Sequence, residues 1–315
     1  MRILVTGGAG FLGSNLCTLL ISRGDRVICL DDLSTGCRAN IEHLFTSPEF
    51  SFIEASVLDP IDIGERVDAV VHLASPASPP AYLERPIFTL RTGAEGTRNA
   101  LEFALTNSAR FILASTSEVY GEPLIHPQSE EYWGNVNPLG PRSVYDEAKR
   151  YAEALTTAYR TACGADTGIV RIFNTYGPRM RSDDGRVVTN FIDQALRCAP
   201  LTVFGDGSQT RSLCYVDDLV RGLAAMLDSA EPGPINLGNP EELTVRQIAE
   251  LVAELIGSSS TIETRPLPQD DPTRRQPDIS RARNLLGWTP QVGLLDGLTR
   301  TIEWHAAALP QVRAS

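Results

Sequence analysis

Short apolar runs alternate with longer stretches of helical periodicity along the first two-thirds of the chain. Short runs rich in β-branched and aromatic residues are typical of strands, whereas apolar positions three and four residues apart are typical of helices. Their alternation predicts an α/β fold of the Rossmann type, a doubly wound parallel sheet with ligands at the carboxyl ends of its strands. The strand-like runs are 3–6, 26–30, 50–53, 69–73, 110–114, 168–173 and 234–238.

The helical pattern is longest in Ile87–Leu105 and Val144–Cys163, and both stretches could also provide a dimer face. A third amphipathic helix is expected at Val245–Ile256. The segment His72–Pro80 follows a strand and contains three prolines, which lack the N–H that a helix needs. It is therefore predicted to be a rigid loop beside the ligand site.

The regular alternation ends after residue 173, where proline and glycine become frequent. We expect a dinucleotide-binding domain at 1–175 plus 212–240, and a smaller, discontinuous substrate-binding domain at 176–211 plus 241–315. An extended, charged loop is expected at Pro266–Pro277. Arginines cluster in this second region, which suggests that it grips phosphates or a carboxylate. These arginines are Arg179, Arg181, Arg186, Arg211, Arg274 and Arg275.

Composition narrows the class of protein. The 315 residues, 42% of them hydrophobic, are enough for about two domains. A net charge of −11 argues against nucleic acid or an anionic membrane as the main partner. Six scattered cysteines show neither Cys-x-x-Cys nor metal-ligand spacing, so we expect reduced thiols and no metal site. With no signal peptide or apolar stretch of ~20 residues, a soluble cytoplasmic protein is expected.

A glycine-rich turn follows the first strand. Gly7, Gly8, Gly10 and Gly13 allow the backbone to approach a pyrophosphate at the start of a helix. The pattern alone is weak evidence, because such turns also occur for structural reasons. It is strengthened by Asp31 at the end of the second strand, where a carboxylate would bind the adenosine ribose and repel a 2′-phosphate. The sequence therefore favours NAD over NADP.

Candidate chemistry centres on Ser143–Lys149 and on Ser115–Gly121, which we expect to face it. Tyr145 and Lys149 lie four residues apart and so share one face of a helix. A neighbouring ammonium favours a phenolate, so Tyr145 could act as a base toward a sugar hydroxyl. His72, at a strand end among apolar residues, is interpreted as a packed histidine rather than a catalyst.

These motifs resemble the extended short-chain dehydrogenases/reductases that act on nucleotide sugars. The resemblance rests on TGGAGFLG at 6–13, STSEVYG at 115–121 and YDEAK at 145–149, and it spans nearly the whole chain. HLASPASPP, HPQSEEYWGNVNP, RIFNTYGPRM, DGRVV, and DDP followed by RQPDI are most similar to the UDP-glucuronate decarboxylase branch. The resemblance implies NAD as the cofactor, UDP-glucuronate as the substrate and a homodimer formed by two long helices.

The family's chemistry begins with oxidation at sugar C4 to a 4-ketone, which with a C6 carboxylate is a β-keto acid that loses CO₂. Related 4,6-dehydratases must expel a C6 hydroxyl and carry an aspartic acid where this chain has Ser117. Serine is a poor acid, so Ser117 argues against dehydration. Thr116 would hydrogen-bond the C4 oxygen, and Glu118 would manage a proton or water at C5, unless it is merely a loop carboxylate at a helix cap.

The roles implied by the resemblance are carried over position by position. Ser56 replaces the usual aspartate near the adenine, and Gly93 replaces the usual asparagine. The catalytic set is Thr116, Ser117, Glu118, Tyr145 and Lys149. The cofactor set is Gly7, Gly10, Phe11, Leu12, Gly13, Asp31, Asp32, Ser34, Thr35, Gly36, Ser56, Val57, Leu73, Ala74, Ser75, Thr92, Ala114, Tyr145, Lys149, Thr175 and Arg186. The substrate set is Asn174, Arg179, Asn190, Val203, Phe204, Gln209, Arg211 and Arg275.

Three alternatives stay open. A UDP-sugar 4-epimerase and a dTDP-glucose 4,6-dehydratase share the expected fold and cofactor, and a non-catalytic NAD-sensing protein could use the same fold. Glu118 weighs against the first, Ser117 against the second, and the retention of Thr116, Tyr145 and Lys149 against the third. The sequence leaves undecided whether the 4-keto pentose is reduced to UDP-xylose or released.

Overall fold

A seven-stranded parallel sheet forms the centre of the protein in the computed structural model, which describes residues 1–308. Its spatial order is β11-β6-β5-β4-β1-β2-β3, and every adjacent pair is parallel. Each strand expected from the sequence is present, so the predicted Rossmann-type α/β fold is confirmed. The strands are β1 (Arg2–Thr6), β2 (Arg26–Asp31), β3 (Phe50–Glu54), β4 (Ala69–His72), β5 (Arg110–Thr116), β6 (Thr167–Ile172) and β11 (Ile235–Leu237).

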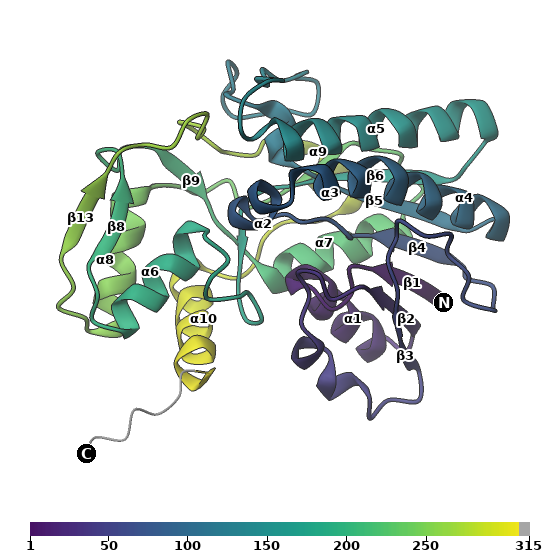
Figure 1. Ribbon diagram of the computed structural model, residues 1–315, viewed down its shortest axis with the longest axis horizontal. Coiled ribbons are helices and arrows are strands. Elements are labelled where there is room, and N and C mark those ends of the chain that lie inside the picture. The colour runs from purple at the N-terminus through teal and green to yellow at the C-terminus, as the bar shows by residue number, and fades with distance from the viewer. Residues whose placement is uncertain (309–315) are drawn as a thin grey trace.

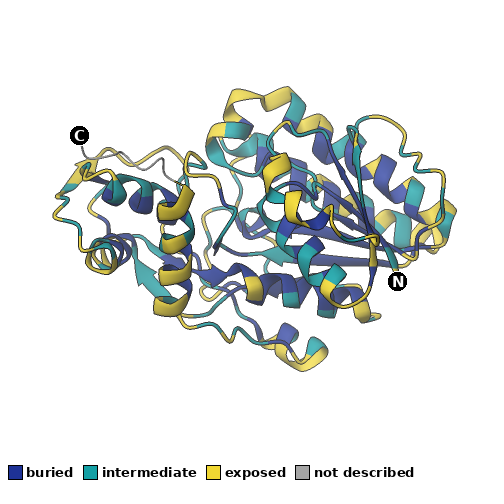
Figure 2. Cartoon of the chain, turned by 90° about the horizontal axis from the view of Figure 1, so that it is seen from below, coloured by how far each residue is buried: buried dark blue, intermediate teal, exposed yellow. Residues whose placement is uncertain are grey.

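Helices cover both faces of this sheet (Figure 1). The face carrying α4 (Thr97–Asn107) and α5 (Ser143–Cys163) is opposite the face carrying α1 (Phe11–Ser22) and α7 (Val216–Asp228). Successive strand residues point to opposite faces, so Leu4 packs in the core under α4 while its neighbours pack under α1. Both faces of the strands are thus buried, as Figure 2 shows for the centre of the sheet.

The helix expected over 87–105 is present and contains a π-helical stretch. Its path consists of α3 (Pro86–Arg91), a π-helical stretch (Thr92–Gly96) and then α4. Gly93 lies against α5, where an added Cβ would fall 2.6 Å from the Cβ of Ala148. The absence of a side chain at Gly93 lets the two helices approach closely. The predicted helix 144–163 is confirmed as α5.

One loop prediction was partly wrong. Helix α2 (Pro79–Glu84) begins inside the segment 72–80, which the sequence predicted to be a loop throughout. Proline is compatible with the first turn of a helix, because the N–H groups of that turn have no partner within the helix. The prolines at 79 and 80 therefore start a helix rather than prevent one.

A smaller layer of strands and helices lies beside the carboxyl ends of the sheet (Figure 1). The predicted helix 245–256 is confirmed as α8, and Thr244 and Gln247 form a capping box at its start. Short strands pair as β8 with β13, β9 with β12, and β7 with β10. The bounds are β7 (Thr175–Tyr176), α6 (Val187–Leu196), β8 (Leu201–Phe204), β9 (Thr210–Ser212), β10 (Cys214–Tyr215), β12 (Glu242–Thr244), α8 (Val245–Ile256), β13 (Ile262–Arg265), α9 (Ser280–Leu286) and α10 (Leu294–Ala308). Short 3₁₀ turns occupy Arg38–Asn40, Glu42–Leu44 and Ser117–Tyr120.

All six cysteines are free thiols, as expected. Within residues 1–308, no helix combines the length and the apolar character needed to cross a membrane. The last part of the predicted substrate domain, residues 309–315, lies outside the described residues.

Candidate active site

A cavity of about 820 Å³ opens at the carboxyl ends of the sheet strands, and residues of the smaller layer line its other side. It gathers residues from segments far apart in the sequence, as a doubly wound sheet predicts. Nearly every candidate site residue lines it. From the catalytic set these are Thr116, Ser117, Glu118, Tyr145 and Lys149. From the cofactor set they are Gly7, Gly10, Phe11, Leu12, Gly13, Asp31, Asp32, Ser34, Thr35, Val57, Leu73, Ala74, Ser75, Thr92, Ala114, Thr175 and Arg186. From the substrate set they are Asn174, Arg179, Asn190, Phe204, Gln209, Arg211 and Arg275.

Three candidates do not line the cavity. Gly36 lies directly against Asp31, whose Oδ1 would be 2.7 Å from an added Cβ. Ser56 Oγ accepts a hydrogen bond from the N–H of Leu58 at 3.3 Å. Val203 is fully buried in β8, whereas its neighbour Phe204 lines the cavity, because successive strand residues face opposite sides.

The glycine turn forms one wall of the cavity. Gly7 has φ +70°, and an added Cβ would fall 2.7 Å from the backbone nitrogen of Ala74. Only glycine fits this close approach of two backbone segments. Helix α1 then begins at Phe11 after Gly10, whose position provides no side-chain cap. The first N–H groups of the helix are thus available to an anion, which fits the pyrophosphate of a dinucleotide.

Asp31 lies at the end of β2 with 6% of its surface exposed. Its carboxylate accepts hydrogen bonds from the N–H of Ala9 at 2.9 Å and of Leu33 at 2.8 Å. Burial raises the pKa of Asp31, and these backbone hydrogen bonds oppose that rise. Asp31 therefore stabilises the backbone of the glycine turn by accepting the N–H of Ala9. Its place at the strand end also fits a ribose diol, so turn and carboxylate together fit a dinucleotide.

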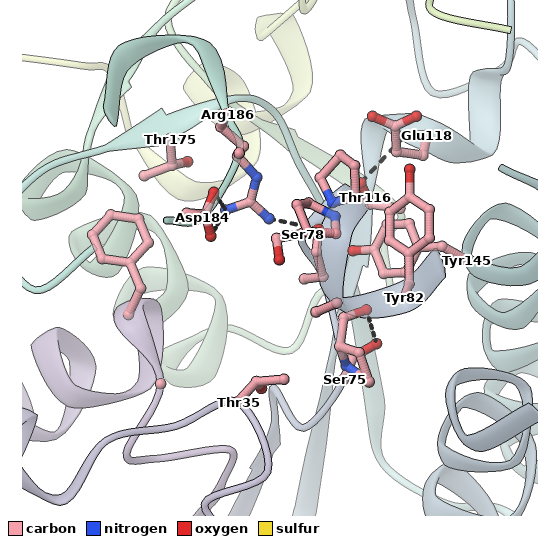
Figure 3. A pocket seen from close by; sticks show the side chains of 18 of the residues that line it. Thr35, Ser75, Ser78, Tyr82, Thr116, Glu118, Tyr145, Thr175, Asp184 and Arg186 are labelled. Atoms are coloured by element: carbon pink, nitrogen blue, oxygen red, sulfur yellow. Dashed lines mark hydrogen bonds and ion pairs between the residues drawn. The ribbon is translucent and has the colours of Figure 1, made fainter. Parts of the chain in front are cut away.

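Tyr145 and Lys149 lie on the buried face of α5, with 6% and 5% of their surfaces exposed. Lys149 Nζ donates to the carbonyl of Ala114 at 2.9 Å and lies 5.9 Å from the centroid of the Tyr145 ring. Thr116 and Glu118 of segment 115–121 lie beside Tyr145 of α5, so the segment faces α5 as expected (Figure 3). Burial raises the pKa of Tyr145 to about 12, while Arg186 and a hydrogen bond with Thr116 oppose that rise. Burial lowers the pKa of Lys149 to about 8.

Glu118 is part of an ion cluster. Its Oε2 lies 2.8 Å from Arg142 Nη2 and 3.6 Å from Arg275 Nη2. Burial opposes ionisation of Glu118, but the two guanidinium charges outweigh it and lower its pKa to about 2. The cap in this loop is formed by Thr116, whose Oγ1 accepts the N–H of Glu118 at 3.2 Å. The Glu118 side chain is thus an ionised group at the cavity and not the capping side chain.

The arginines expected to bind ligand lie in different environments. Arg179 donates to the carbonyl of Ser14 at 3.1 Å and to Thr18 Oγ1 at 2.9 Å, both on α1. It joins the loop after β7 to the sheet domain. Arg186 donates to the carbonyl of Ala77 at 2.6 Å. Among the remaining arginines, Arg181 pairs with Asp183, Arg274 is exposed and Arg275 is buried.

Arg211 is fixed to the loop between β13 and α9. It donates to the carbonyl of Pro272 and to Asp271 Oδ2, each at 2.8 Å. The expected extended loop at 266–277 is present, without helix or strand. Arg211 therefore holds this loop over the cavity besides presenting a charge to it.

The residues of the cavity wall that sequence reasoning missed include Tyr82, Arg142 and Asp271. Arg142 stands three residues before Tyr145, and this spacing could have identified it, because helix residues three apart are neighbours. Tyr82 lies on α2, just beyond the segment 72–80 that was predicted to be a loop, so no local pattern pointed to it.

His72 is a packed histidine, as interpreted from the sequence. It is 1% exposed, and its ring nitrogens lie 2.8 Å from Thr6 Oγ1 and 3.3 Å from Thr97 Oγ1. Burial lowers its pKa to about 3, so the ring is neutral. Within residues 1–308, no group of three or more His, Cys, Asp or Glu side chains is arranged to hold a metal ion.

Fold and site define an enzyme of the Rossmann class, with a glycine turn that fits a dinucleotide and a tyrosine–lysine pair in the same cavity. The chain belongs to the NAD dependent epimerase/dehydratase family, whose model matches residues 3–238.

UDP-glucuronic acid decarboxylase 1 of Arabidopsis thaliana is 53% identical over 302 residues, which are 96% of this chain and 69% of that protein. UDP-glucuronic acid decarboxylase 1 of Danio rerio is 51% identical over 98% of this chain and 73% of its own length. The solved UDP-glucuronic acid 4-epimerase of Bacillus cereus, in complex with UDP-glucuronic acid and NAD, is 33% identical, with a TM-score of 0.87 over 96% of this chain and 98% of that one.

Proposed function

We propose that this chain is an NAD-dependent UDP-glucuronate decarboxylase that acts through a 4-keto sugar and forms UDP-xylose, UDP-4-keto-xylose or both, with CO₂. The observation that carries this proposal is Ser117 beside Thr116, Tyr145 and Lys149, in a chain 51–53% identical to proteins named UDP-glucuronic acid decarboxylase. The site has the groups for oxidation at C4, and serine stands where a dehydratase needs an acid.

The two ligands would occupy opposite ends of the cavity. NAD, when bound, accepts a hydride from the sugar and can return it. The glycine turn and Asp31 would hold its pyrophosphate and adenosine ribose, and Lys149 would hold the nicotinamide ribose. Accordingly, 1–175 plus 212–240 would form the cofactor domain, and 176–211 plus 241–315 the nucleotide-sugar domain.

Tyr145 would take the proton of the C4 hydroxyl while Thr116 hydrogen-bonds the same oxygen. Because burial raises the pKa of Tyr145 to about 12, ionisation needs nearby positive charge and hydrogen bonds to the phenolate. Arg186 and Thr116 both act in this direction. Loss of CO₂ from a 4-keto acid needs no leaving-group acid, so Ser117 suffices beside C5 and C6. Glu118, ionised in the cavity, would then manage the proton or water at C5.

The enzyme alternatives are weaker. A 4,6-dehydratase needs an acid at the position of Ser117, and serine is a poor one. A 4-epimerase must rotate its 4-keto sugar without losing CO₂. An epimerase reaction would leave Glu118 without a role at C5. The presence of Tyr145, Lys149 and Thr116 around one cavity likewise disfavours a non-catalytic NAD sensor.

A homodimer is also proposed. Apolar side chains are exposed on helices that lie on one face of the sheet (Figure 1), including Ile87 and Leu90 on α3 and Tyr151 on α5. Pairing α5 with its copy would cover them across a two-fold axis. The cytoplasm is the proposed location, because the six free thiols suit a reducing compartment.

The direct test incubates the purified chain with NAD⁺ and either UDP-glucuronate or dTDP-glucose and identifies products by mass spectrometry. We expect CO₂ and a UDP-pentose from UDP-glucuronate, and no 6-deoxy-4-keto sugar from dTDP-glucose. A C4-epimer of UDP-glucuronate as the main product, or a dehydrated sugar, would contradict the proposal.

A further inference from the structure

Two successive residues of β5 are fixed by two residues of α5 that lie one turn apart. Lys149 Nζ donates to the carbonyl of Ala114 at 2.9 Å, and Ser115 Oγ donates to Glu153 Oε1 at 2.6 Å. Helix residues four apart share a face, so Lys149 and Glu153 are neighbours, with Tyr145 one turn before them. Lys149 thus has a carboxylate neighbour that is outside the set of candidate catalytic residues.

Glu153 is held in place by Arg171 of β6. Arg171 Nε donates to Glu153 Oε1 at 2.9 Å, and its Nη2 donates to Oε2 at 2.7 Å. The side chains of Arg171 and Glu153 are 11% and 14% exposed. A bidentate pair of this kind fixes the orientation of both groups. The Glu153 carboxylate is therefore directed into the protein and not toward solvent.

The same guanidinium reaches the other end of the catalytic segment. Arg171 Nη1 donates to the hydroxyl of Tyr120 at 3.0 Å, and its guanidinium carbon lies 4.9 Å from the centroid of the Tyr120 ring. Glu153 thus holds Ser115 directly and Tyr120 through Arg171. Both ends of segment 115–120 are tied to one ion pair.

Lys149 is the only lysine of the chain, and the other basic residues among its 28 Lys and Arg are arginines. Arginine keeps its charge at any pH at which the protein is folded, whereas a buried lysine can lose its charge. Burial lowers the pKa of Lys149 to about 8, and Glu153 opposes that fall. Without Glu153, the pKa would fall further, and a larger share of Lys149 would be neutral near pH 7 to 8.

Other ionisable groups near Lys149 do not replace this charge. Burial keeps His72 neutral, and it raises the pKa values of Tyr82, Tyr120 and Tyr145, so the three phenols are uncharged near neutral pH. Charged groups on the elements packed against α5 form ion pairs of their own, which are Glu118 with Arg142 and Arg275, Arg91 with Glu95, Arg98 with Glu102, and Arg110 with Asp166. The carboxylate of Glu153 is therefore the charge that supports the Lys149 ammonium.

We propose that Glu153, fixed by Arg171, is a positioning residue that keeps the Lys149 side chain positively charged and holds segment 115–120 against α5. The Lys149 ammonium, 5.9 Å from the centroid of the Tyr145 ring, then favours the phenolate of that tyrosine. Neither Glu153 nor Arg171 lines the cavity, so both act without touching a ligand. This role rests on the proposed function where turnover is the readout, whereas the charge of Lys149 can be measured without it.

The single lysine allows a direct measurement. In NAD-loaded protein made with lysine that is isotope-labelled at Cε, the lysine NMR signal comes from Lys149 alone, and its shift against pH gives the midpoint of deprotonation. Glu153→Gln should lower this midpoint by about one pH unit. Glu153→Asp keeps the charge and should retain most of the wild-type midpoint. Glu250→Gln, at an exposed glutamate on α8, is the matched control and should leave the midpoint unchanged.

A double variant removes an ambiguity, because Glu153→Gln alone leaves Arg171 buried without its partner. That unpaired charge could itself repel the ammonium or prevent folding. In Glu153→Gln/Arg171→Gln both charges are gone, and the midpoint should still lie below that of the wild type. A wild-type midpoint in the double variant would overturn the role of Glu153.

Turnover separates the charge of Lys149 from simple support of segment 115–120. The alkaline limit of kcat should move to lower pH together with the lysine midpoint, because only the ammonium form of Lys149 assists Tyr145. If kcat of Glu153→Gln instead falls by one factor at every pH, with the wild-type alkaline limit, the proposed role is wrong and Glu153 is only structural. Failure of the proposed function would look different: wild-type protein would release no CO₂ from UDP-glucuronate, while the lysine midpoint would still depend on Glu153.

Discussion

The ring of Tyr82 stacks on the ring of Tyr145, with centroids 5.3 Å apart and planes 5° from parallel. Tyr82 comes from α2 and Tyr145 from α5, so this contact joins the proline-rich segment to the candidate base. The orientation of the Tyr145 ring is thus set by packing, independently of its hydroxyl. A phenylalanine at 145 would keep the ring and remove the proton-transfer group.

Tyr145→Phe should therefore reduce kcat at least about 100-fold, because a general base contributes roughly 10²- to 10⁴-fold. The Kd of NAD should stay nearly unchanged, since the pocket keeps its shape. Turnover and calorimetric titration measure both effects. Tyr151→Phe, on the exposed side of the same helix, is the control and should leave kcat as in wild type. Unchanged turnover in Tyr145→Phe would show that another group takes the proton.

Asp146 should make stability depend on pH. Burial raises its folded pKa to about 8 from the ordinary value of 3.8, so between these pH values the folded state keeps a proton that the unfolded state has lost. The free energy of unfolding then falls as pH rises through this window, by at most about 1.4 kcal/mol per pH unit. Asp146→Asn does not titrate, so its stability relative to wild type should increase from pH 5 to pH 7.5 in urea unfolding. Parallel pH profiles would contradict this assignment.

Asp31 should exclude NADP. A 2′-phosphate beside a buried carboxylate costs several kcal/mol, so wild type should bind NAD about 100-fold more tightly than NADP. Asp31→Asn keeps an acceptor for the N–H of Ala9 or Leu33. It should reduce the difference between the affinities for NAD and NADP, mainly by improving NADP binding. Titration of both cofactors measures this. Equal affinities in wild type would mean that Asp31 only braces the glycine turn.

Arg211 should contribute to nucleotide-sugar binding in two ways. Arg211→Ala removes a charge from the cavity and frees the loop that Arg211 holds through Pro272 and Asp271. We expect roughly 10- to 100-fold weaker binding of both UDP-glucuronate and UDP-glucose, with NAD binding unchanged. Arg197→Ala is the control, and wild-type affinity in Arg211→Ala would refute the assignment.

A substitution on the exposed face of α3 tests the proposed homodimer. Light scattering should give a mass of two chains for wild type at micromolar concentration. Ile87→Asp places a charge among apolar groups that the proposed pairing would bury, so it should shift the protein toward monomer. Leu295→Asp, at an exposed apolar residue on α10, is the matched control. A monomeric wild type, or a fully dimeric Ile87→Asp, would contradict this interface.

Much of the fold was determined by local sequence. The strand runs, the glycine turn and the Tyr145–Lys149 spacing are patterns within a few residues, and their geometry follows from the backbone periodicity of helices and strands. Asp31 was found for the same reason, since its position depends on the end of one strand. The chain order of strands and helices also predicted the edge of the sheet at which the cavity opens.

Tertiary structure alone decided the contacts between distant segments. Glu118 meets Arg275 across more than 150 residues of sequence, and Tyr82 reaches Tyr145 only because α2 folds against α5. Burial is likewise a property of the folded molecule. The spacing of Tyr145 and Lys149 had suggested that the lysine lowers the pKa of the phenol, but in the folded protein burial raises that pKa. Side-chain type and spacing thus determined which groups are available for chemistry, and only packing determined their partners and their charge.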